Sequence, residues 1–367
     1  MELKGKKVLL VSPQPWGGGQ VSKHHYAREL NRRGVQVFFL EPPSGKKGKE
    51  RFRIKEEVMP GLYVVLHESP LSGLRFYPPF IRKRLMKEQV RKLERLCAPE
   101  GFDIVWSFEG SRFFDLELFG PESLKVFHMV DLVQDHNLSK VAGTADLVLC
   151  TTSFIETRLS PYTSEVNKIP HGYAPSGKEE GTRKKGKGMQ VAYMGNLSIP
   201  YLDRELIKEL LRRFPDPCFH FFGPAFEGDA FLERLKEFDN AVLHGPLPAE
   251  DVRSSLASMD ILLILYNAES YRKQVAAPHK MMDYLASGKA VVATWMEEHR
   301  EHCDLIRMVE RQEDFIPAFE EVIRDLDIWN SPELQKRRKA IAETRTYDKL
   351  LDRILEKARE AKPTFFR

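Results

Sequence analysis

Two side chains that could bind a phosphorylated ligand stand three residues apart in the stretch APHKMMDYLASGKAVVAT, residues 277–294. Pro278 fits the first turn of a helix, where free backbone N–H groups and the positive end of the helix dipole suit a phosphate. Lys280 adds a cation, and the Asp283 carboxylate on the same helix face can accept hydrogen bonds from ribose hydroxyls. The alternative is a surface helix with an intrahelical Lys280–Asp283 ion pair, worth about 0.2–0.5 kcal/mol.

A second group of ionisable residues follows predicted strands in WSFEGSR and FHMVDLVQDH. A carboxylate or imidazole with a tuned pKa can accept a proton from a reacting hydroxyl. We favour Asp131 as this general base, with His128 second and Glu109 third; Asp135 and His136 end the same stretch. The alternative is that the acids cap the next helix.

The glycine-rich loop WGGGQ, residues 16–20, follows the first predicted strand and precedes a helix. Gly18 and Gly19 let the backbone approach a ligand and leave N–H groups exposed; a flexible turn is the alternative. The spacing is not GxGxxG. Glu41, however, ends the second strand, where an NAD enzyme places its ribose-binding acid. An NAD(P)-dependent oxidoreductase therefore remains a competing hypothesis.

The 367 residues exceed the usual size of a single core, and strand–helix–strand patterns occur in two series. We expect an α/β fold of two Rossmann-like domains facing each other across a cleft, with ligands beyond the carboxyl ends of the strands. The predicted domains are residues 1–173 and 191–345. Residues 174–190, rich in Gly, Lys and Arg, form a predicted linker.

The overall composition is typical of a soluble globular protein. Hydrophobic residues make up 42% and charged residues 30%, with a net charge of +4. No apolar run reaches the roughly 18 residues of a membrane span, and the N-terminus is unlike a signal peptide. Four widely separated cysteines indicate reduced thiols rather than disulfides or zinc, so we expect a cytoplasmic protein. No nucleic-acid-binding motif is present, and we expect no nucleic acid partner.

The stretch from residue 74 to residue 96 is basic and amphipathic. Such a helix can lie on an anionic bilayer, and the alternative is a solvated surface helix. The residues assigned to this membrane- or acceptor-facing surface are Arg82, Lys83, Arg84, Lys87 and Phe80.

The stretch PHKMMDYLASGKAVVAT resembles the motif Pro-x-Lys-x-x-Glu-Tyr-Leu-Ala-x-Gly-Lys-Pro-Val-Val at the nucleotide site of GT-B glycosyltransferases. It is most similar to bacterial cell-surface polysaccharide enzymes of the glycosyltransferase 4 kind. VAYMGNL, FHFFGP and AVLHGPLPAEDVRSSLASMDILLILY resemble successive parts of the family's C-terminal domain, and KIPHGY resembles its last N-domain strand. The resemblance implies that residues 346–367 form a helix that returns to the acceptor-binding N-domain.

By this resemblance, Lys280 holds the diphosphate and Asp283 the ribose of a UDP- or GDP-linked sugar, while His171 helps to orient the donor. The predicted nucleotide-sugar-binding residues are Lys280, Met281, Asp283, Gly195, Asn196, Gly223, Pro224, Leu247, Gly18, Gly19 and His171. No metal and no cofactor are expected. Two departures stand out: Asp283 replaces the usual glutamate, and Val275 occupies a position where many members carry an acid.

The resemblance implies a hexosyltransferase-type enzyme that transfers a sugar to a saccharide or lipid-linked acceptor in cell-surface polysaccharide or glycolipid synthesis. Its expected location is the cytoplasm, with the inner face of the cell membrane as a peripheral site. Because of Val275, a non-catalytic relative that binds a nucleotide sugar is the main alternative.

Overall fold

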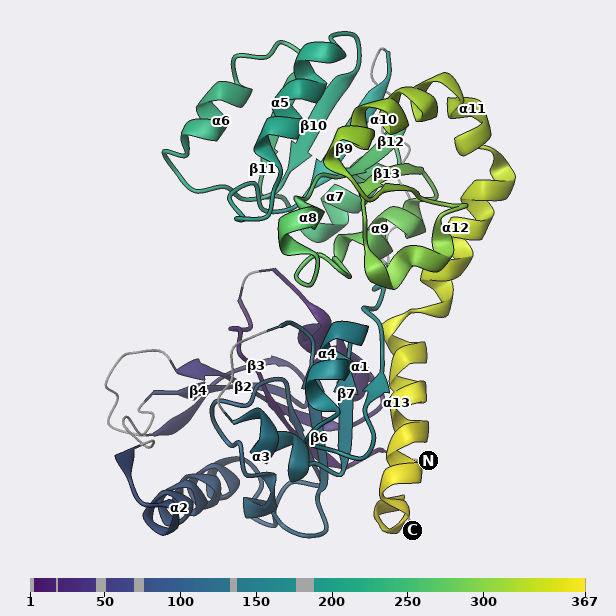
Figure 1. Ribbon diagram of the computed structural model, residues 1–367. Helices are drawn as coiled ribbons and strands as arrows, with labels where there is room; N and C mark the ends of the chain where they lie inside the picture. The colour runs from purple at the N-terminus through teal and green to yellow at the C-terminus, as the bar shows by residue number, and fades with distance from the viewer. Residues whose placement is uncertain are drawn as a thin grey trace. The chain divides into compact units, whose positions relative to one another are not determined.

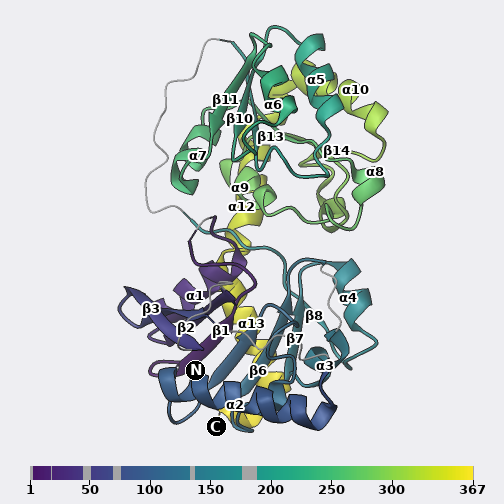
Figure 2. The ribbon, with the colours of Figure 1, turned by 90° about the vertical axis from the view of Figure 1, so that its left-hand side faces the viewer.

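The computed structural model describes residues 3–17, 19–43, 51–68, 76–132, 137–175 and 188–366. Gly18, Asp135, His136 and most of the predicted linker lie outside these ranges. The chain forms two compact units: unit 1 comprises Met1–Pro170 and Tyr347–Arg367, and unit 2 comprises His171–Thr346. Figures 1 and 2 show the elements of each unit.

Unit 1 contains an eight-stranded sheet that is parallel except for the antiparallel pair β3 and β4. In sheet order the strands are β3 (Phe52–Met59), β4 (Leu62–His67), β2 (Gln36–Pro43), β1 (Lys7–Val11), β5 (Ile104–Ser107), β6 (Leu124–Met129), β7 (Leu147–Cys150) and β8 (Asn167–Lys168). The described helices of unit 1 are α1 (Ser22–Arg32), α2 (Pro79–Cys97), η2 (Leu116–Leu118), α3 (Leu138–Gly143), α4 (Ser153–Leu159), α13 (Tyr347–Ala361) and η5 (Pro363–Phe366).

The central strands of unit 1 are apolar at nearly every position because helices bury both faces of the sheet. Leu9 and Val11 of β1 belong to one core cluster with Met86 and Leu93 of α2. Helices α1 and α13 pack against each other, and α1 also contacts β2. The Arg33 guanidinium, just after α1, donates to carboxylates of α13.

Unit 2 contains a six-stranded sheet in which every pair is parallel. In sheet order its strands are β11 (Ala241–Gly245), β10 (Cys218–Phe222), β9 (Gln190–Met194), β12 (Ile261–Ile264), β13 (Ala290–Thr294) and β14 (Arg307–Val309). The described helices are α5 (Arg204–Arg213), α6 (Ala230–Leu235), α7 (Ala249–Leu256), α8 (Ala268–Tyr271), α9 (Lys280–Ser287), η3 (Glu297–His302), η4 (Gln312–Asp314), α10 (Phe315–Arg324), α11 (Leu326–Trp329) and α12 (Pro332–Thr344).

These two sheets confirm the predicted architecture of two parallel-dominated α/β domains. The direction of the strand order reverses between β9 and β12 in unit 2, and such a switch point is where open parallel sheets bind ligands. Within residues 346–367, where the last helix is predicted, the structure has α13 and the short η5, and α13 is separated from α12 by Arg345 and Thr346. At this break the Tyr173 N–H donates to the Arg345 carbonyl at 2.8 Å.

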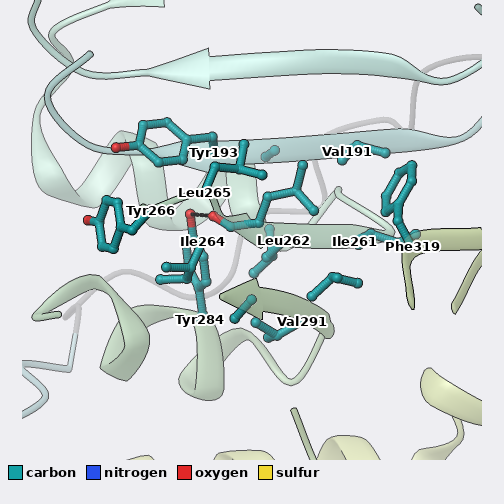
Figure 3. Close-up of a cluster of buried hydrophobic side chains, with 14 of the residues drawn as sticks. Val191, Tyr193, Ile261, Leu262, Ile264, Leu265, Tyr266, Tyr284, Val291 and Phe319 are labelled. Carbon is teal, nitrogen blue, oxygen red and sulfur yellow. Dashed lines mark hydrogen bonds between the residues drawn. The ribbon is translucent and has the colours of Figure 1, made fainter. Parts of the chain in front are cut away.

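The switch point of unit 2 is held by one tyrosine hydroxyl. Strands β9 and β12 pair only through Val191–Ile261 and Ala192–Leu262. Farther along, the Tyr284 hydroxyl of α9 accepts a hydrogen bond from the Met194 N–H at 2.8 Å and donates to the Leu263 carbonyl at 3.1 Å. Figure 3 shows Tyr284 among the surrounding core side chains. The helix that carries the predicted site residues is therefore fixed to the ends of both strands.

We expect Tyr284→Phe to lower the free energy of unfolding by about 1–3 kcal/mol, because it leaves buried backbone groups of two strands without a partner. Chemical denaturation of the full chain measures this change. Tyr271→Phe is the matched control, since the half-buried Tyr271 hydroxyl makes no hydrogen bond within the described ranges. A loss no greater than that of the control would show that the bridge does not stabilise the sheet.

Candidate functional site

Lys280 begins α9 and points its ammonium group to the carboxyl ends of β9 and β12. Its Nζ lies 3.8 Å from the ring centroid of Tyr193 and 4.9 Å from that of Tyr266. The side chain is 91% buried, and Nζ has no hydrogen-bond partner among the residues that the structure describes. Figure 3 shows the two tyrosine rings at these strand ends. An unpartnered buried cation is costly to keep, so a ligand is its natural partner.

Burial lowers the pKa of Lys280 well below its usual value. The cation–π contact with each tyrosine ring favours the charged form by about 2 kcal/mol in such a desolvated site. The effective cost of removing an ammonium from water is several kcal/mol. Desolvation therefore outweighs the ring contacts, and an anion placed beside Nζ would restore the charged state.

Glycines at neighbouring strand ends permit close approaches around this lysine. A Cβ atom on Gly195 would lie 2.4 Å from Lys280 Nζ, and one on Gly223 would lie 2.1 Å from the Gly195 carbonyl oxygen. The Gly195 N–H donates to the Phe222 carbonyl and the Gly223 N–H to the Gly245 carbonyl. The ends of β9, β10 and β11 are thereby joined side by side, and any larger residue at Gly195 or Gly223 would displace them.

The neighbouring predicted residues Asn196 and Pro224 lie in the same two loops. The Asn196 side-chain oxygen accepts from the Ser198 N–H at 2.8 Å, and the Pro224 carbonyl accepts from the Leu197 N–H at 2.9 Å. Both contacts shape the loop after β9. Together with Gly195, Gly223 and Lys280, these residues form one group at the carboxyl edge of unit 2.

Asp283 does not form the intrahelical ion pair with Lys280 that was the alternative prediction. Its Oδ1 instead accepts from Arg253 Nε of α7 at 2.7 Å. Burial raises the pKa of Asp283, and the Arg253 guanidinium opposes that shift. Sequence reasoning missed Arg253, because nothing in its local pattern distinguishes it from a surface arginine.

The remaining predicted donor residues are placed in different ways. His171 is buried with its ring against that of His279, at a centroid distance of 3.5 Å, and is thus beside the start of α9. Leu247 follows β11 and is 37% exposed. Met281 is fully buried in the core, so its side chain is not available to a ligand, and Val275 is buried as well. Gly19 is exposed and belongs to unit 1.

A pocket of about 480 Å³ opens at the switch point of unit 2. It lies between the loop after β9, the start of α5 and Asn267, three residues beyond the end of β12. Its polar lining includes the Asp203 carboxylate, whose Oδ2 has no partner within the described ranges and whose pKa is raised by burial. The lining residues are Ser198, Ile199, Pro200, Leu202, Asp203, Arg204, Glu205 and Asn267.

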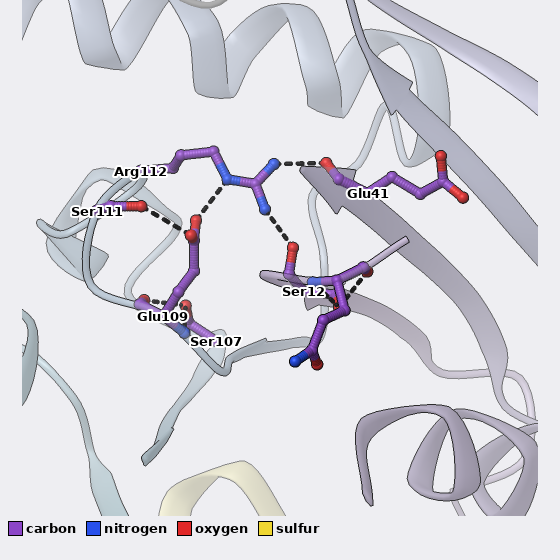
Figure 4. A network of polar contacts seen from close by, with 7 residues as sticks. Ser12, Glu41, Ser107, Glu109, Ser111 and Arg112 are labelled. Carbon is purple, nitrogen blue, oxygen red and sulfur yellow. Dashed lines mark hydrogen bonds and ion pairs between the residues drawn. The ribbon is translucent and has the colours of Figure 1, made fainter. Parts of the chain in front are cut away.

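In unit 1, Arg112 organises the carboxyl ends of three strands, as Figure 4 shows. It donates from Nε to the Glu109 carboxylate, and from its two terminal nitrogens to the carbonyls of Glu41 and Ser12 at 2.6 Å each. Ser111 donates to the other Glu109 oxygen at 2.7 Å. Glu109 is therefore held in a fixed position rather than left free.

Glu41 holds the glycine-rich loop in place. Its Oε1 accepts from the Trp16 N–H at 2.8 Å, and the side chain is buried. His24 of α1 supports the same loop: its Nδ1 accepts from the Val21 N–H and its Nε2 donates to the Pro15 carbonyl. Because Glu41 is buried and holds this loop, its position counts against a role in binding the ribose of NAD.

The three candidate bases differ in accessibility. Asp131 follows β6 and is exposed. His128 is 99% buried beside the rings of Tyr26 and Phe108. Neither His128 ring nitrogen has a partner within the described ranges, and burial lowers its pKa to about 3. Because an acceptor could contact the exposed Asp131 but not the enclosed His128, accessibility favours Asp131 as the general base.

Lys23 of α1 is a further ionisable group at this edge that sequence reasoning missed. It is almost fully buried and donates to the Gln14 side-chain oxygen. Burial lowers its pKa to about 8, while the carboxylates of Asp131 and Glu109 act in the opposite direction. The lysine is thus close enough to both acids for an electrostatic interaction with each of them.

Helix α2 buries Met86, Val90 and Leu93 and turns its basic residues outward. Phe80 is 74% exposed, and Lys83, Arg84 and Lys87 are exposed as well. Arg82 is half-buried, with its guanidinium 5.6 Å from the ring centroid of Phe114. Within the described ranges, no helix has the length and apolarity needed to cross a membrane, and no group of ligating side chains could hold a metal ion.

No family model matches the sequence. Over 167 residues the chain is 26% identical to a Bacillus subtilis (strain 168) protein, TuaH, whose name describes a teichuronic acid biosynthesis glycosyltransferase. The aligned part spans 42% of this chain and 42% of that protein.

Solved structures match over nearly the whole chain. Sucrose-phosphate synthase from Thermosynechococcus elongatus is 13% identical, with 97% of this chain and 98% of that one covered and a TM-score of 0.70. HepE of Anabaena, solved with UDP and glucose, is also 13% identical, with 96% and 99% covered and a TM-score of 0.62. This likeness confirms the predicted GT-B fold.

We expect Lys280→Met to raise the free energy of unfolding at pH 7 by about 1–3 kcal/mol, because it removes a buried polar group that has no partner in the described part of the chain. The pKa of Lys280 is lower in the folded than in the unfolded chain, so the wild type gains stability as pH rises toward about 10, the unfolded value. The advantage of the variant should therefore shrink between pH 7 and pH 9.5 in denaturant titrations.

The exposed Lys236→Met is the control, and its stability difference should be small and independent of pH. A lower free energy of unfolding for Lys280→Met than for the wild type at pH 7 would contradict this prediction. It would show that Lys280 stabilises the fold despite its burial.

Proposed function

We propose that this GT-B protein is a glycosyltransferase that moves a sugar from a UDP- or GDP-linked donor to a saccharide or lipid-linked acceptor. Its products would belong to cell-surface polysaccharide or glycolipid synthesis. The observation that carries the proposal is the buried amino group of Lys280 at the start of α9, which lies beside Gly195 at the end of β9 and has no hydrogen-bond partner among the described residues. The partial match to TuaH supports the proposed product class.

In this proposal, unit 2 stabilises the leaving nucleoside diphosphate. As the bond between the anomeric carbon and the phosphate oxygen breaks, negative charge develops on the diphosphate. In this proposal, Lys280 and the N–H groups of the first turn of α9 would neutralise that charge. The Asp283 carboxylate would accept hydrogen bonds from the ribose. This arrangement supplies positive charge from protein groups alone.

The acceptor hydroxyl forms the new bond to the anomeric carbon and loses its proton. The exposed Asp131 of unit 1 would take that proton in an inverting reaction. In a retaining reaction the leaving phosphate oxygen would take it.

Two alternatives make different predictions. The buried Val275 leaves the donor sugar without the acid that many relatives place there, which favours a protein that binds a nucleotide sugar without transferring it. An NAD(P)-dependent oxidoreductase would need Glu41 for the cofactor ribose. The hydrogen bond from the Trp16 N–H to Glu41 counts against this second alternative.

Calorimetric titration with UDP, GDP, ADP, TDP, NAD and NADP tests the proposal. We expect one nucleoside diphosphate to bind the wild type and Lys280→Met to weaken that binding by tenfold or more, since a charge-assisted contact is worth about 1.5–3 kcal/mol. Because the variant is expected to be more stable than the wild type, weaker binding cannot be attributed to unfolding.

Release of the diphosphate from the matching donor sugar, with saccharide and lipid-linked acceptors, separates the first two hypotheses. Turnover lost in Asp131→Asn supports the transferase. Tight binding without turnover under every donor and acceptor supports the non-catalytic relative. Binding of NAD or NADP alone would overturn the proposal.

We also propose that the outward face of α2 rests on an anionic membrane surface at the inner face of the cell membrane. Phe80 is available for insertion between lipids, and Lys83, Arg84 and Lys87 are available for their headgroups. Each basic residue near such a surface contributes about 1 kcal/mol. A lipid-linked acceptor would then be presented close to unit 1.

Reversal of three charges, Lys83→Glu, Arg84→Glu and Lys87→Glu together, should weaken binding to vesicles of phosphatidylglycerol and phosphatidylcholine about 100-fold or more in a sedimentation assay. The matched control reverses three exposed charges of unit 2, at Lys236, Lys273 and Arg300. Equal losses in both triple variants would mean that net charge rather than α2 drives the attraction. No binding by the wild type would refute the membrane role.

A further inference from the structure

The ion pair between Arg253 and Asp283 joins two helices at the carboxyl edge of unit 2. Arg253 lies on α7, Asp283 lies one turn into α9, and Arg253 Nε is 2.7 Å from Asp283 Oδ1. The Arg253 guanidinium also lies 5.8 Å from the ring centroid of Tyr173. The arginine is thus restrained from two sides, by a carboxylate and by an aromatic ring.

Both side chains keep part of their hydrogen-bonding capacity. About a fifth of each remains exposed, 19% of Arg253 and 21% of Asp283. Asp283 Oδ2 accepts no hydrogen bond within the described ranges. A carboxylate can accept hydrogen bonds at both of its oxygens. The bond that holds Asp283 Oδ1 therefore also fixes the orientation of Oδ2, which can still accept a hydrogen bond from a ligand.

We infer that Arg253 is a positioning residue that orients Asp283 to recognise the ribose hydroxyls of a nucleoside diphosphate. The inference rests on the proposed function, because it concerns the ribose end of the same donor. An aspartate side chain is short, so its carboxylate reaches a ribose hydroxyl only in a suitable orientation. A neighbouring side chain such as Arg253 can hold the carboxylate in that orientation. A ligand that finds the carboxylate already oriented avoids the entropic cost of ordering it.

The expected consequence is discrimination between ribose and deoxyribose. A site that presents a charged acceptor to a hydroxyl rejects the analogue that lacks the hydroxyl, because the buried acceptor is then left unpaired. We expect the wild type to bind the ribonucleoside diphosphate at least tenfold more tightly than its 2′-deoxy or 3′-deoxy form. Asp283→Asn should remove most of this ratio.

The test measures that ratio by calorimetry in Arg253→Gln, Arg253→Lys and the double variant Arg253→Gln/Asp283→Asn. We expect Arg253→Gln to reduce the ratio to about threefold or less, while affinity for the deoxy form changes little. Arg253→Lys, which can still donate to Oδ1, should restore part of the ratio. The double variant should lose no more discrimination than Asp283→Asn does alone.

Arg213→Gln is the matched control, since it breaks another inter-helix ion pair of unit 2, with Glu320, and should leave the ratio unchanged. If Arg253→Gln weakens the ribo and deoxy forms equally, or only lowers the melting temperature, Arg253 serves the fold and the inference is overturned. If the wild type binds no nucleoside diphosphate, the proposed function falls, and this inference falls with it.

Discussion

The Tyr284 hydroxyl is the contact on which the candidate donor site depends. Strands β9 and β12 stop pairing before their carboxyl ends, and the hydroxyl occupies the opening by bonding to the Met194 N–H and the Leu263 carbonyl. Because Tyr284 belongs to α9, the same two bonds fix the helix against the switch point. Lys280, one turn earlier, and Asp283, the preceding residue, take their places from that attachment.

Lys280 illustrates how a binding site can oppose the stability of its own fold. The side chain is buried against tyrosine rings, and its ammonium lacks a hydrogen-bond partner within the described ranges. Gly195 and Gly223 are required because the lysine and the backbone approach so closely there. A hydrophobic core of strands and helices surrounds the group, and its stability offsets the cost of burying this amino group.

In unit 1, by contrast, the charged groups Arg112 and Glu41 have hydrogen-bond partners within the protein. Arg112 bonds to one carboxylate and two backbone carbonyls, and Glu41 bonds to the Trp16 N–H. These groups are satisfied within the protein and hold the loops after β1, β2 and β5. Among the candidate bases at this edge, Asp131 is the one that is exposed, whereas the nearby Lys23 is buried and bonded to Gln14.

The sequence by itself determined the two α/β domains, the positions of most strands and the placement of Lys280 at a helix start. These features follow from apolar runs, from helix and turn residues and from the spacing of a short motif, all of which act over a few residues. Glycines at the ends of β9 and β10 were also identified from the sequence, since they directly follow apolar strands.

Only the tertiary structure decided how the charged groups are paired. It gave Asp283 a partner 30 residues away, Arg253, in place of Lys280, and it joined Glu41 to the glycine-rich loop. It also enclosed His128 in aromatic rings while leaving Asp131 exposed. Such contacts join elements that are remote in the chain, and they depend on how helices and strands pack, which no local pattern of residues encodes.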